Sequence, residues 1–325
     1  MRRPLLLIAA AVIVVGCAAA DPAASSSSPA APAPEPISSD SPALGATPVS
    51  STPTPTAPDQ PGPTTATETT VWIPAGDHRV PGTLAVPALT PGQVVPAVLL
   101  LHGDFSSRDE NANLFGRLAS ALSARGIASL RIDFAGSGAS EEPDLALDYP
   151  GMVLDATASL KFLEGQPSLD ATKLAVLGLS RGGSIAATVA GTVPGVAALV
   201  SWSGAIANAY EEDPDAHERA RADGEVVIDL GDREFHVSLA WFDTISDSHP
   251  LDDVAGFANP VLAVVGSDDD VVSPEISDIF LARVASPEKS LHVVDGGDHG
   301  FAADPEYGDE AIAVTTGWLA DRFLN

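Results

Sequence analysis

The sequence predicts an α/β fold in which a mostly parallel central sheet has helices on both faces and carries a small inserted lid. Two observations favour it. From about residue 67 onward, short apolar runs with the length of buried strands alternate with helix-compatible segments. Several runs stop abruptly at loops rich in glycine, aspartate or histidine, and α/β proteins build their sites at the carboxyl ends of such strands. We therefore expect one α/β domain over 67–325.

The expected strands and helices follow the apolar runs in chain order. Strands are expected at 94–101, 127–133, 174–179, 196–202, 259–266 and 290–294, and helices at 109–125 and 184–190. Between the fourth and fifth of these strands lie about 55 residues, far more than a plain crossover needs. Residues 204–257 are therefore expected to form the inserted lid.

The lid has three expected parts. Residues 205–223 are highly acidic and compatible with a helix, 225–238 have the pattern of a β-hairpin with a Gly-Asp turn, and 239–257 look helical. The aromatic side chains of the lid either line a pocket for an acyl or aryl group or fasten the lid to the core, and the sequence leaves both open. These side chains are Tyr210, Phe235, Trp241 and Phe242.

The most informative motif lies in residues 174–183, Leu-Ala-Val-Leu-Gly-Leu-Ser-Arg-Gly-Gly. An apolar strand ends in G-x-S-x-G and continues as an apolar helix, which is typical of a nucleophile elbow. Glycine on either side of the serine permits the tight turn. Ser180 is therefore the candidate nucleophile. The backbone N–H of Arg181, the residue that opens the helix, is a candidate donor to an oxyanion hole.

A serine hydroxyl needs a base, and the base needs an acid that orients it. His299 follows the strand at 290–294 in a glycine-rich loop and is the candidate base. The aspartates at 268–270 follow the strand that ends at Gly266. Three adjacent carboxylates cannot all be buried without a large like-charge cost, so we expect one to face His299 and the others to be solvated.

The remaining histidines have none of the spacings of a metal site, such as H-x-x-x-H or H-E-x-x-H. We therefore expect no metal ion and no cofactor. The turn that begins at Asp133 contains a Gly-x-Gly at Gly136 and Gly138. A dinucleotide-binding fingerprint would also need a third glycine and the start of a helix, and both are missing. A tight turn after the strand is the better interpretation.

With these residues in place, the chain resembles the α/β-hydrolase superfamily from about Thr70 to the C-terminus. The resemblance is carried by the chain order Ser, Asp, His, by the His102-Gly103 pair and by the D-x-x-G-x-G-x-S turn that starts at Asp133. Within the superfamily, the segment 99–140 and the place of the lid are most similar to bacterial cinnamoyl and feruloyl-type esterases.

The resemblance also implies which aspartate is the acid of the triad. The turn of the family reads roughly G-x-x-D-x-x-V, and Gly266, Asp269 and Val272 fit that spacing. Asp269 is therefore the candidate acid, with Asp268 as the alternative. Asp298, next to His299, is expected to be a loop residue.

The place after His102-Gly103 implies that the backbone N–H of Asp104 is the second oxyanion donor, with Phe105 as the alternative. Relatives often carry an apolar residue there. We expect the Asp104 carboxylate to point away, because it would oppose a developing oxyanion. His102 is expected to order the loop, and the Arg181 guanidinium to pair with a carboxylate.

The N-terminus has the pattern of an export signal. A basic start precedes an apolar run at 5–15 that is too short for a stable membrane span. Val-Val-Gly-Cys17 then resembles a bacterial lipobox, which implies cleavage after residue 16 and lipid attachment to Cys17; ordinary cleavage after 18–20 is the alternative. Cys17 is the single cysteine, so no disulfide is expected. Residues 17–66, dominated by Ala, Ser, Pro and Thr, are expected to form a disordered tether.

The formal net charge is −28, and it becomes more negative once the two arginines of the signal are removed. Such acidity argues against nucleic-acid binding, for which a basic patch would be expected. Membrane association would therefore come from the lipid. We expect an extracytoplasmic protein anchored to the bacterial cell membrane, or a secreted one if Cys17 is not lipidated.

Together these observations predict a serine hydrolase that cleaves small carboxylic esters through an acyl-enzyme intermediate. A peptidase or an acyltransferase on the same triad is an alternative, as is a non-catalytic surface lipoprotein or an adhesion role for the acidic lid. The sequence leaves the oligomeric state open.

Overall fold

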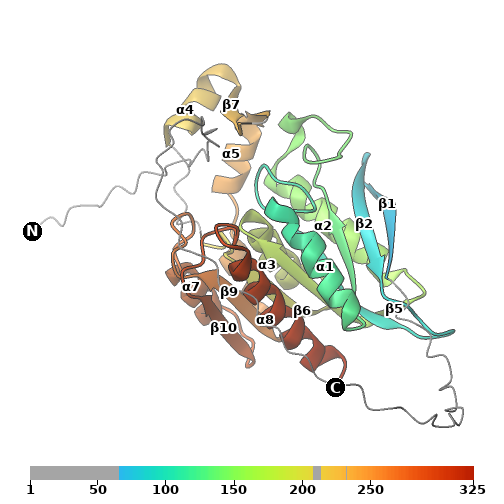
Figure 1. The fold of residues 1–325 in the computed structure, drawn as a ribbon. Helices are drawn as coiled ribbons and strands as arrows, with labels where there is room; N and C mark the ends of the chain where they lie inside the picture. The colour runs from blue at the N-terminus through green and yellow to red at the C-terminus, as the bar shows by residue number, and fades with distance from the viewer. Residues whose placement is uncertain (1–65, 208–213, 232) are drawn as a thin grey trace, which may run out of the picture. The chain divides into compact units, whose positions relative to one another are not determined.

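The computed structural model describes residues 66–207, 214–231 and 233–325. Eight strands form one sheet in the order β1-β2-β4-β3-β5-β6-β9-β10 (Figure 1). Only the pairs β1–β2 and β2–β4 are antiparallel, so the prediction of a mostly parallel sheet is confirmed. The strands are β1 Thr67–Ala75, β2 His78–Val86, β3 Val95–Leu101, β4 Ala128–Ile132, β5 Leu169–Leu179, β6 Val196–Trp202, β9 Val261–Gly266 and β10 Lys289–Val294.

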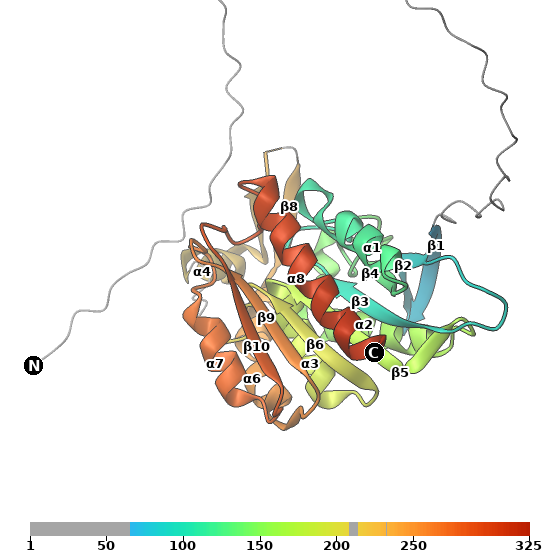
Figure 2. The same ribbon diagram turned by 60° about the horizontal axis from the view of Figure 1, so that its bottom comes forward.

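Helices cover both faces of this sheet (Figures 1 and 2). Helices α1 and α8 pack on one face and α2, α3 and α7 on the other. Strand β3 is buried on both faces: Val98 and Leu100 face α1 and α8, whereas Leu99 and Leu101 face the opposite layer. This explains its unbroken apolar sequence. The helices are α1 Leu114–Ala124, α2 Tyr149–Glu164, α3 Arg181–Thr192, α7 Glu275–Arg283 and α8 Pro305–Phe323.

The inserted lid lies between β6 and β9, as predicted. Its elements are α4 Pro214–Asp223, β7 Glu225–Asp229, β8 Glu234–Ser238, α5 Leu239–Ser246 and α6 Pro250–Asp253. In Figure 1, α4, β7 and α5 lie together above the sheet. Strands β7 and β8 pair antiparallel, which confirms the predicted hairpin.

The described lid aromatics belong to the core. Phe235, Trp241 and Phe242 are all buried. The rings of Phe235 and Trp241 lie 5.0 and 5.4 Å from the ring of Phe105. Of the two open interpretations, these three residues therefore fit the one in which the aromatics fasten the lid. Tyr210 lies outside the described residues.

The predicted helix at 109–125 is wrong in its first turn. Helix α1 begins only at Leu114, and the residues before it make a short 3-10 turn. Glu110, Ala112 and Asn113 have left-handed φ angles of 57°, 51° and 53°, which a right-handed helix cannot contain. The side chains of this segment instead bind neighbouring elements, as described below for Glu110.

Two further helix predictions in the lid were too long. Residues 205–207 are not helical, because the amide of Ala205 donates to the carbonyl of Ser180. The helical stretch expected at 239–257 is broken between α5 and α6. His249 at this break precedes a proline and has φ −133° and ψ 55°, outside the helical region that a proline disfavours for the residue before it.

The predicted signal at 1–16, the lipidated Cys17 and all but the last residue of the tether at 17–66 lie outside the described residues. Within the part of the chain that the structure describes, no helix has both the length and the apolar character needed to cross a membrane.

Candidate active site

Ser180 lies at a sharp turn between β5 and α3. Its φ and ψ angles are 54° and −120°, a conformation that non-glycine residues rarely adopt and that is typical of functional sites. A Cβ atom on Gly178 would collide with the backbone of Gly182, and one on Gly182 would collide with the backbone of Leu101. The two glycines of G-x-S-x-G are therefore required by space, and the predicted elbow is confirmed.

The loop after β6 holds this turn in place. The amide of Ser180 donates to the carbonyl of Trp202 at 2.9 Å, and the carbonyl of Ser180 accepts from the amide of Ala205 at 3.0 Å. Both backbone groups of the strained residue are thus hydrogen-bonded to one neighbouring segment, which offsets the cost of its conformation.

Ser180, His299 and Asp269 form one hydrogen-bonded chain. His299 Nε2 lies 2.9 Å from Ser180 Oγ, and His299 Nδ1 lies 3.0 Å from both carboxylate oxygens of Asp269. With the imidazole proton on Nδ1, His299 donates to Asp269 and accepts the serine proton at Nε2. The structure thus brings together three residues that are far apart in the sequence, in the geometry of a nucleophile, a base and an orienting acid.

The three adjacent aspartates have different surroundings. The side chain of Asp269 is buried, and its Oδ1 also accepts from the amides of Val271 and Val272 at 3.1 and 2.8 Å. Asp268 and Asp270 are exposed, which agrees with the expected division into one buried and two solvated carboxylates. Asp298 caps its own loop by accepting from the amides of residues 302 and 303.

His102 orders the loop after β3. It is buried; its Nδ1 lies 2.7 Å from the carbonyl of Gly103, and its Nε2 accepts from the amide of Phe134 at 3.2 Å. These two contacts use both ring nitrogens of a neutral imidazole. The predicted structural role of His102 agrees with this arrangement.

Residues 103–106 contain the candidate oxyanion donor Asp104 and are called the oxyanion loop here. A Cβ atom on Gly103 would lie 3.2 Å from the Cβ of Ser180, so this loop passes directly beside the candidate nucleophile. The amide of Gly103 donates to Glu110 Oε1 at 2.5 Å, and the Ser106 hydroxyl donates to Glu110 Oε2 at 2.8 Å. The Gly103 amide is therefore occupied, which leaves the amides of Asp104 and Phe105 as the candidate oxyanion donors of this loop.

Glu110 is a supporting residue that the sequence did not reveal. It was expected to lie inside the helix at 109–125. The left-handed backbone at this position is not encoded by a glycine or asparagine, so the sequence held no signal for the contact.

The lid also contacts the oxyanion loop. Arg233 Nη2 donates to the carbonyl of Phe105 at 3.1 Å, and the guanidinium carbon lies 5.1 Å from the centre of the Phe235 ring. Phe105 itself has φ 59°. The hairpin of the lid therefore supports a left-handed residue in the oxyanion loop.

The side chains of the two candidate oxyanion residues bind each other. Arg181 Nε donates to Asp104 Oδ2 at 3.0 Å, and the two side chains are only 4% and 17% exposed. The expectation that the Arg181 guanidinium pairs with a carboxylate is confirmed, and the carboxylate proves to be that of Asp104.

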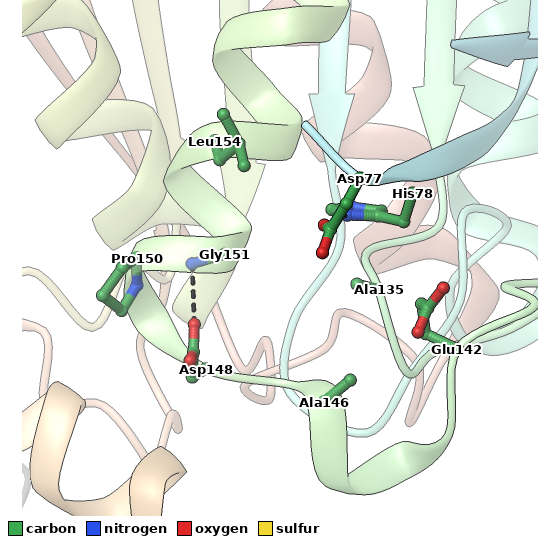
Figure 3. Close-up of a pocket in the computed structure, with 9 residues that line it drawn as sticks. All are labelled: Asp77, His78, Ala135, Glu142, Ala146, Asp148, Pro150, Gly151 and Leu154. Carbon is green, nitrogen blue, oxygen red and sulfur yellow. Dashed lines mark hydrogen bonds and ion pairs between the residues drawn. The ribbon is translucent and has the colours of Figure 1, made fainter. Parts of the chain in front are cut away.

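A cavity of about 470 Å³ lies between the β1–β2 turn and the start of α2 (Figure 3). Figure 3 shows Asp77 and His78 on one side of it and Gly151 and Leu154 on the other. Neither Ser180 nor His299 lines this cavity, so it is separate from the candidate active site. Among the described residues, no group of three or more His, Cys, Asp or Glu side chains could hold a metal ion.

Comparison with known proteins agrees with this fold. The family model described as serine aminopeptidase, S33, matches residues 92–226, a segment that contains the oxyanion loop and the elbow but ends before Asp269 and His299. A protein of Mycobacterium tuberculosis, itself uncharacterised, is 27% identical over 229 residues, which cover 69% of each chain.

Solved structures with the same architecture include esterases. The esterase domain of a Rhodothermus marinus protein is 24% identical, with a TM-score of 0.59 over 80% of this chain and all of its own. Est1E of Butyrivibrio proteoclasticus with ferulic acid bound is 20% identical, with a TM-score of 0.61 over 77% of this chain and 96% of its own. At these identities the likeness shows the fold. The protein therefore has the fold of the α/β-hydrolases.

Proposed function

We propose that the protein is a serine hydrolase that cleaves carboxylic esters of small molecules. The observation that carries the proposal is the hydrogen-bonded chain from Ser180 Oγ through His299 to Asp269, with distances of 2.9 and 3.0 Å, at a strained elbow. A serine hydroxyl so placed has a base within reach, and the base is held in the required tautomer by a buried carboxylate.

The proposed reaction has two halves. Ser180 Oγ attacks the ester carbonyl while His299 Nε2 takes its proton, and the amides of Arg181 and Asp104 stabilise the oxyanion of the tetrahedral intermediate. The imidazolium then protonates the departing alcohol, which leaves an acyl group on Ser180. Water, deprotonated by His299, attacks the acyl-enzyme, and the acid is released as Ser180 recovers its proton.

Hydrolysis of model esters by the full-length chain tests this proposal. The substrates are p-nitrophenyl acetate, butyrate and octanoate together with methyl ferulate, whose ring is of the kind that feruloyl-type esterases accept. Ser180→Ala is expected to lower kcat by about 10⁴-fold or more, because it removes the nucleophile. A folded wild-type chain that is no faster than Ser180→Ala on all four substrates would contradict the proposal.

A second candidate function is peptide-bond hydrolysis, which the match to a family described as serine aminopeptidase favours. Aminoacyl p-nitroanilides distinguish the two functions, since a peptidase cleaves these amides at rates comparable with the esters. Added alcohols or amines separate an acyltransferase from both, because an acceptor would then speed the release of p-nitrophenol.

We also propose that the protein is extracytoplasmic and anchored through a lipid on Cys17. The basic start, the short apolar run and the Val-Val-Gly-Cys17 sequence support this proposal. Mass spectrometry of the mature N-terminus is the measurement. A diacylglyceryl-modified Cys17 as the first residue supports the anchor, and a first residue beyond Cys17 contradicts it.

A further inference from the structure

We propose that the ion pair between Asp104 and Arg181 is a positioning device that sets the spacing of the oxyanion hole. This inference rests on the proposed function, because these are the two residues whose backbone amides are the candidate oxyanion donors. Each donor would then be located by the side chain of the other.

The two donors come from separate parts of the chain. Asp104 lies on the loop after β3, whereas Arg181 begins the helix after β5, 77 positions later. Strands β3 and β5 are neighbours in the sheet, with Leu101 paired to Gly178. The sheet therefore brings the two loops close, but the final distance between the amides depends on contacts beyond the strand ends.

The ion pair is a direct side-chain link across this gap. Its 3.0 Å contact is largely removed from solvent, where a charge-assisted hydrogen bond is strong and directional. The other carboxylate oxygen, Asp104 Oδ1, is buried and accepts no hydrogen bond from a described residue. The Asp104 carboxylate therefore depends on Arg181 for compensation of its charge, and breaking the pair would leave a poorly solvated anion beside the site.

The lid contributes to the orientation of the pair. The guanidinium carbon of Arg181 lies 5.9 Å from the centre of the Trp241 ring in α5, at the outer limit of a cation–π contact. Trp241 also lies against Phe105, the residue after Asp104. One lid residue thus contacts both segments that the ion pair joins.

The pair also resolves an electrostatic conflict. An unpaired carboxylate next to the oxyanion hole would repel the negative charge that develops in the transition state. With Arg181 bound to it, the carboxylate is neutralised and its position is fixed. Loss of either partner should therefore raise the energy of the transition state more than that of the bound substrate, which lowers kcat and leaves KM nearly unchanged.

A double-mutant cycle on the full-length chain tests this inference with Asp104→Asn, Arg181→Gln and the double variant. The measurements are kcat and KM for p-nitrophenyl butyrate and the rate at which a fluorophosphonate labels Ser180. Each single variant should lower kcat and the labelling rate by about 10- to 100-fold. The loss in the double variant should be smaller than the product of the two single losses, because both single changes remove the Asp104–Arg181 contact.

The exposed pair Arg79–Glu141 is the matched control. It has a similar length, 2.8 Å, but its side chains are 54% and 59% exposed. Arg79→Gln, Glu141→Gln and their double variant should leave kcat and labelling unchanged. If Asp104→Asn or Arg181→Gln loses its cooperative unfolding transition, Arg181→Lys replaces it, since lysine keeps the charge and should retain part of the rate.

Three outcomes would overturn the inference. The single variants could keep the wild-type kcat and labelling rate, or their losses could multiply in the double variant. A change in KM alone would instead assign Arg181 to substrate binding. Labelling separates this inference from the proposed function. A chain that labels but cleaves no ester contradicts the ester proposal, and its labelling rates still decide the role of the pair. A wild-type chain that is not labelled and cleaves no ester overturns both this inference and the proposed function.

Discussion

Two aspartates that are adjacent in the sequence differ in their burial and in their hydrogen-bond partners. Asp269 is buried against His299 and accepts hydrogen bonds from two backbone amides, whereas Asp268 is exposed and accepts one from the Ser267 hydroxyl. Asp269→Asn should lower kcat by about 10⁴-fold, because an amide group at this position favours the wrong imidazole tautomer. Steady-state hydrolysis of p-nitrophenyl butyrate measures the effect.

Asp268→Asn is the control for this change, since it makes the same substitution one residue away in solvent. It should keep kcat within about twofold of the wild type. A loss in Asp268→Asn as large as that in Asp269→Asn would contradict the assignment of the acid, and the alternative of the sequence analysis would then be favoured.

At the scale of elements, the oxyanion loop is held by side chains from outside it. Glu110 binds the loop at both ends, through the Gly103 amide and the Ser106 hydroxyl. Glu110→Ala should lower kcat about 10-fold and change KM little, because the loop would be placed less accurately while the substrate pocket stays intact. Kinetics of ester hydrolysis check this, with Glu141→Ala, at a side chain that is 59% exposed, as the control.

A rise in KM without a loss of kcat in Glu110→Ala would contradict this view of the loop. It would show that Glu110 shapes the substrate pocket rather than the oxyanion donors.

The segment that contains Glu110 and α1 shows why the sequence predicted the presence of a helix more accurately than the residue at which it begins. The apolar periodicity from 114 to 124 identified α1 correctly, because it reflects the face that packs on the sheet. The left-handed residues just before it are Glu, Ala and Asn, of which only asparagine is associated with such backbone. Glu110, the first of them, binds the oxyanion loop, a contact that no local pattern encodes.

At the scale of the whole molecule, His78 links three parts of the fold. It lies at the β1–β2 turn, and its Nε2 is 2.7 Å from Asp155 of α2, whose other oxygen accepts from the amide of Ala135 after β4. Burial alone lowers the pKa of His78, but the hydrogen bond and charge of Asp155, with Asp77 and Glu142 nearby, raise it above 6.5 overall. The folded protein therefore binds a proton here that the unfolded chain releases.

This linkage makes stability depend on pH. A raised histidine pKa contributes stability that is fully present below pH 6.5 and is lost as the pH rises through the folded pKa. Burial also raises the pKa of Asp155 above 3.8, so its own contribution falls as the pH rises through a more acidic range. Burial raises the pKa of Tyr149 to about 12, so this residue does not titrate near neutrality.

Urea unfolding of the full-length chain between about pH 6 and pH 9 measures the effect. The wild type should lose free energy of unfolding across this range, and His78→Gln should show a flatter dependence together with lower stability at the acidic end. His236→Gln, at a side chain that is 42% exposed, should keep the wild-type slope. An unchanged slope in His78→Gln would contradict the linkage.

The sequence by itself determined the class of fold, the elbow at Ser180 and the identity of its candidate partners. These features are local: a glycine pattern that space requires, apolar runs that must be buried, and polar residues directly after strands. His299 and one of the aspartates at 268–270 were expected near Ser180 because parallel strands end on one edge of a sheet. The choice of Asp269 among the three came from the resemblance to the family turn.

Only the tertiary structure decided what supports these residues. Glu110 under the oxyanion loop, Arg233 on the carbonyl of Phe105 and Arg181 on Asp104 are contacts between segments that are distant in the chain or irregular in backbone. Each depends on packing to within about an ångström, which sequence spacing does not encode. Short sequence motifs thus predict the chemistry of the site, whereas its geometry depends on contacts that form only in the folded molecule.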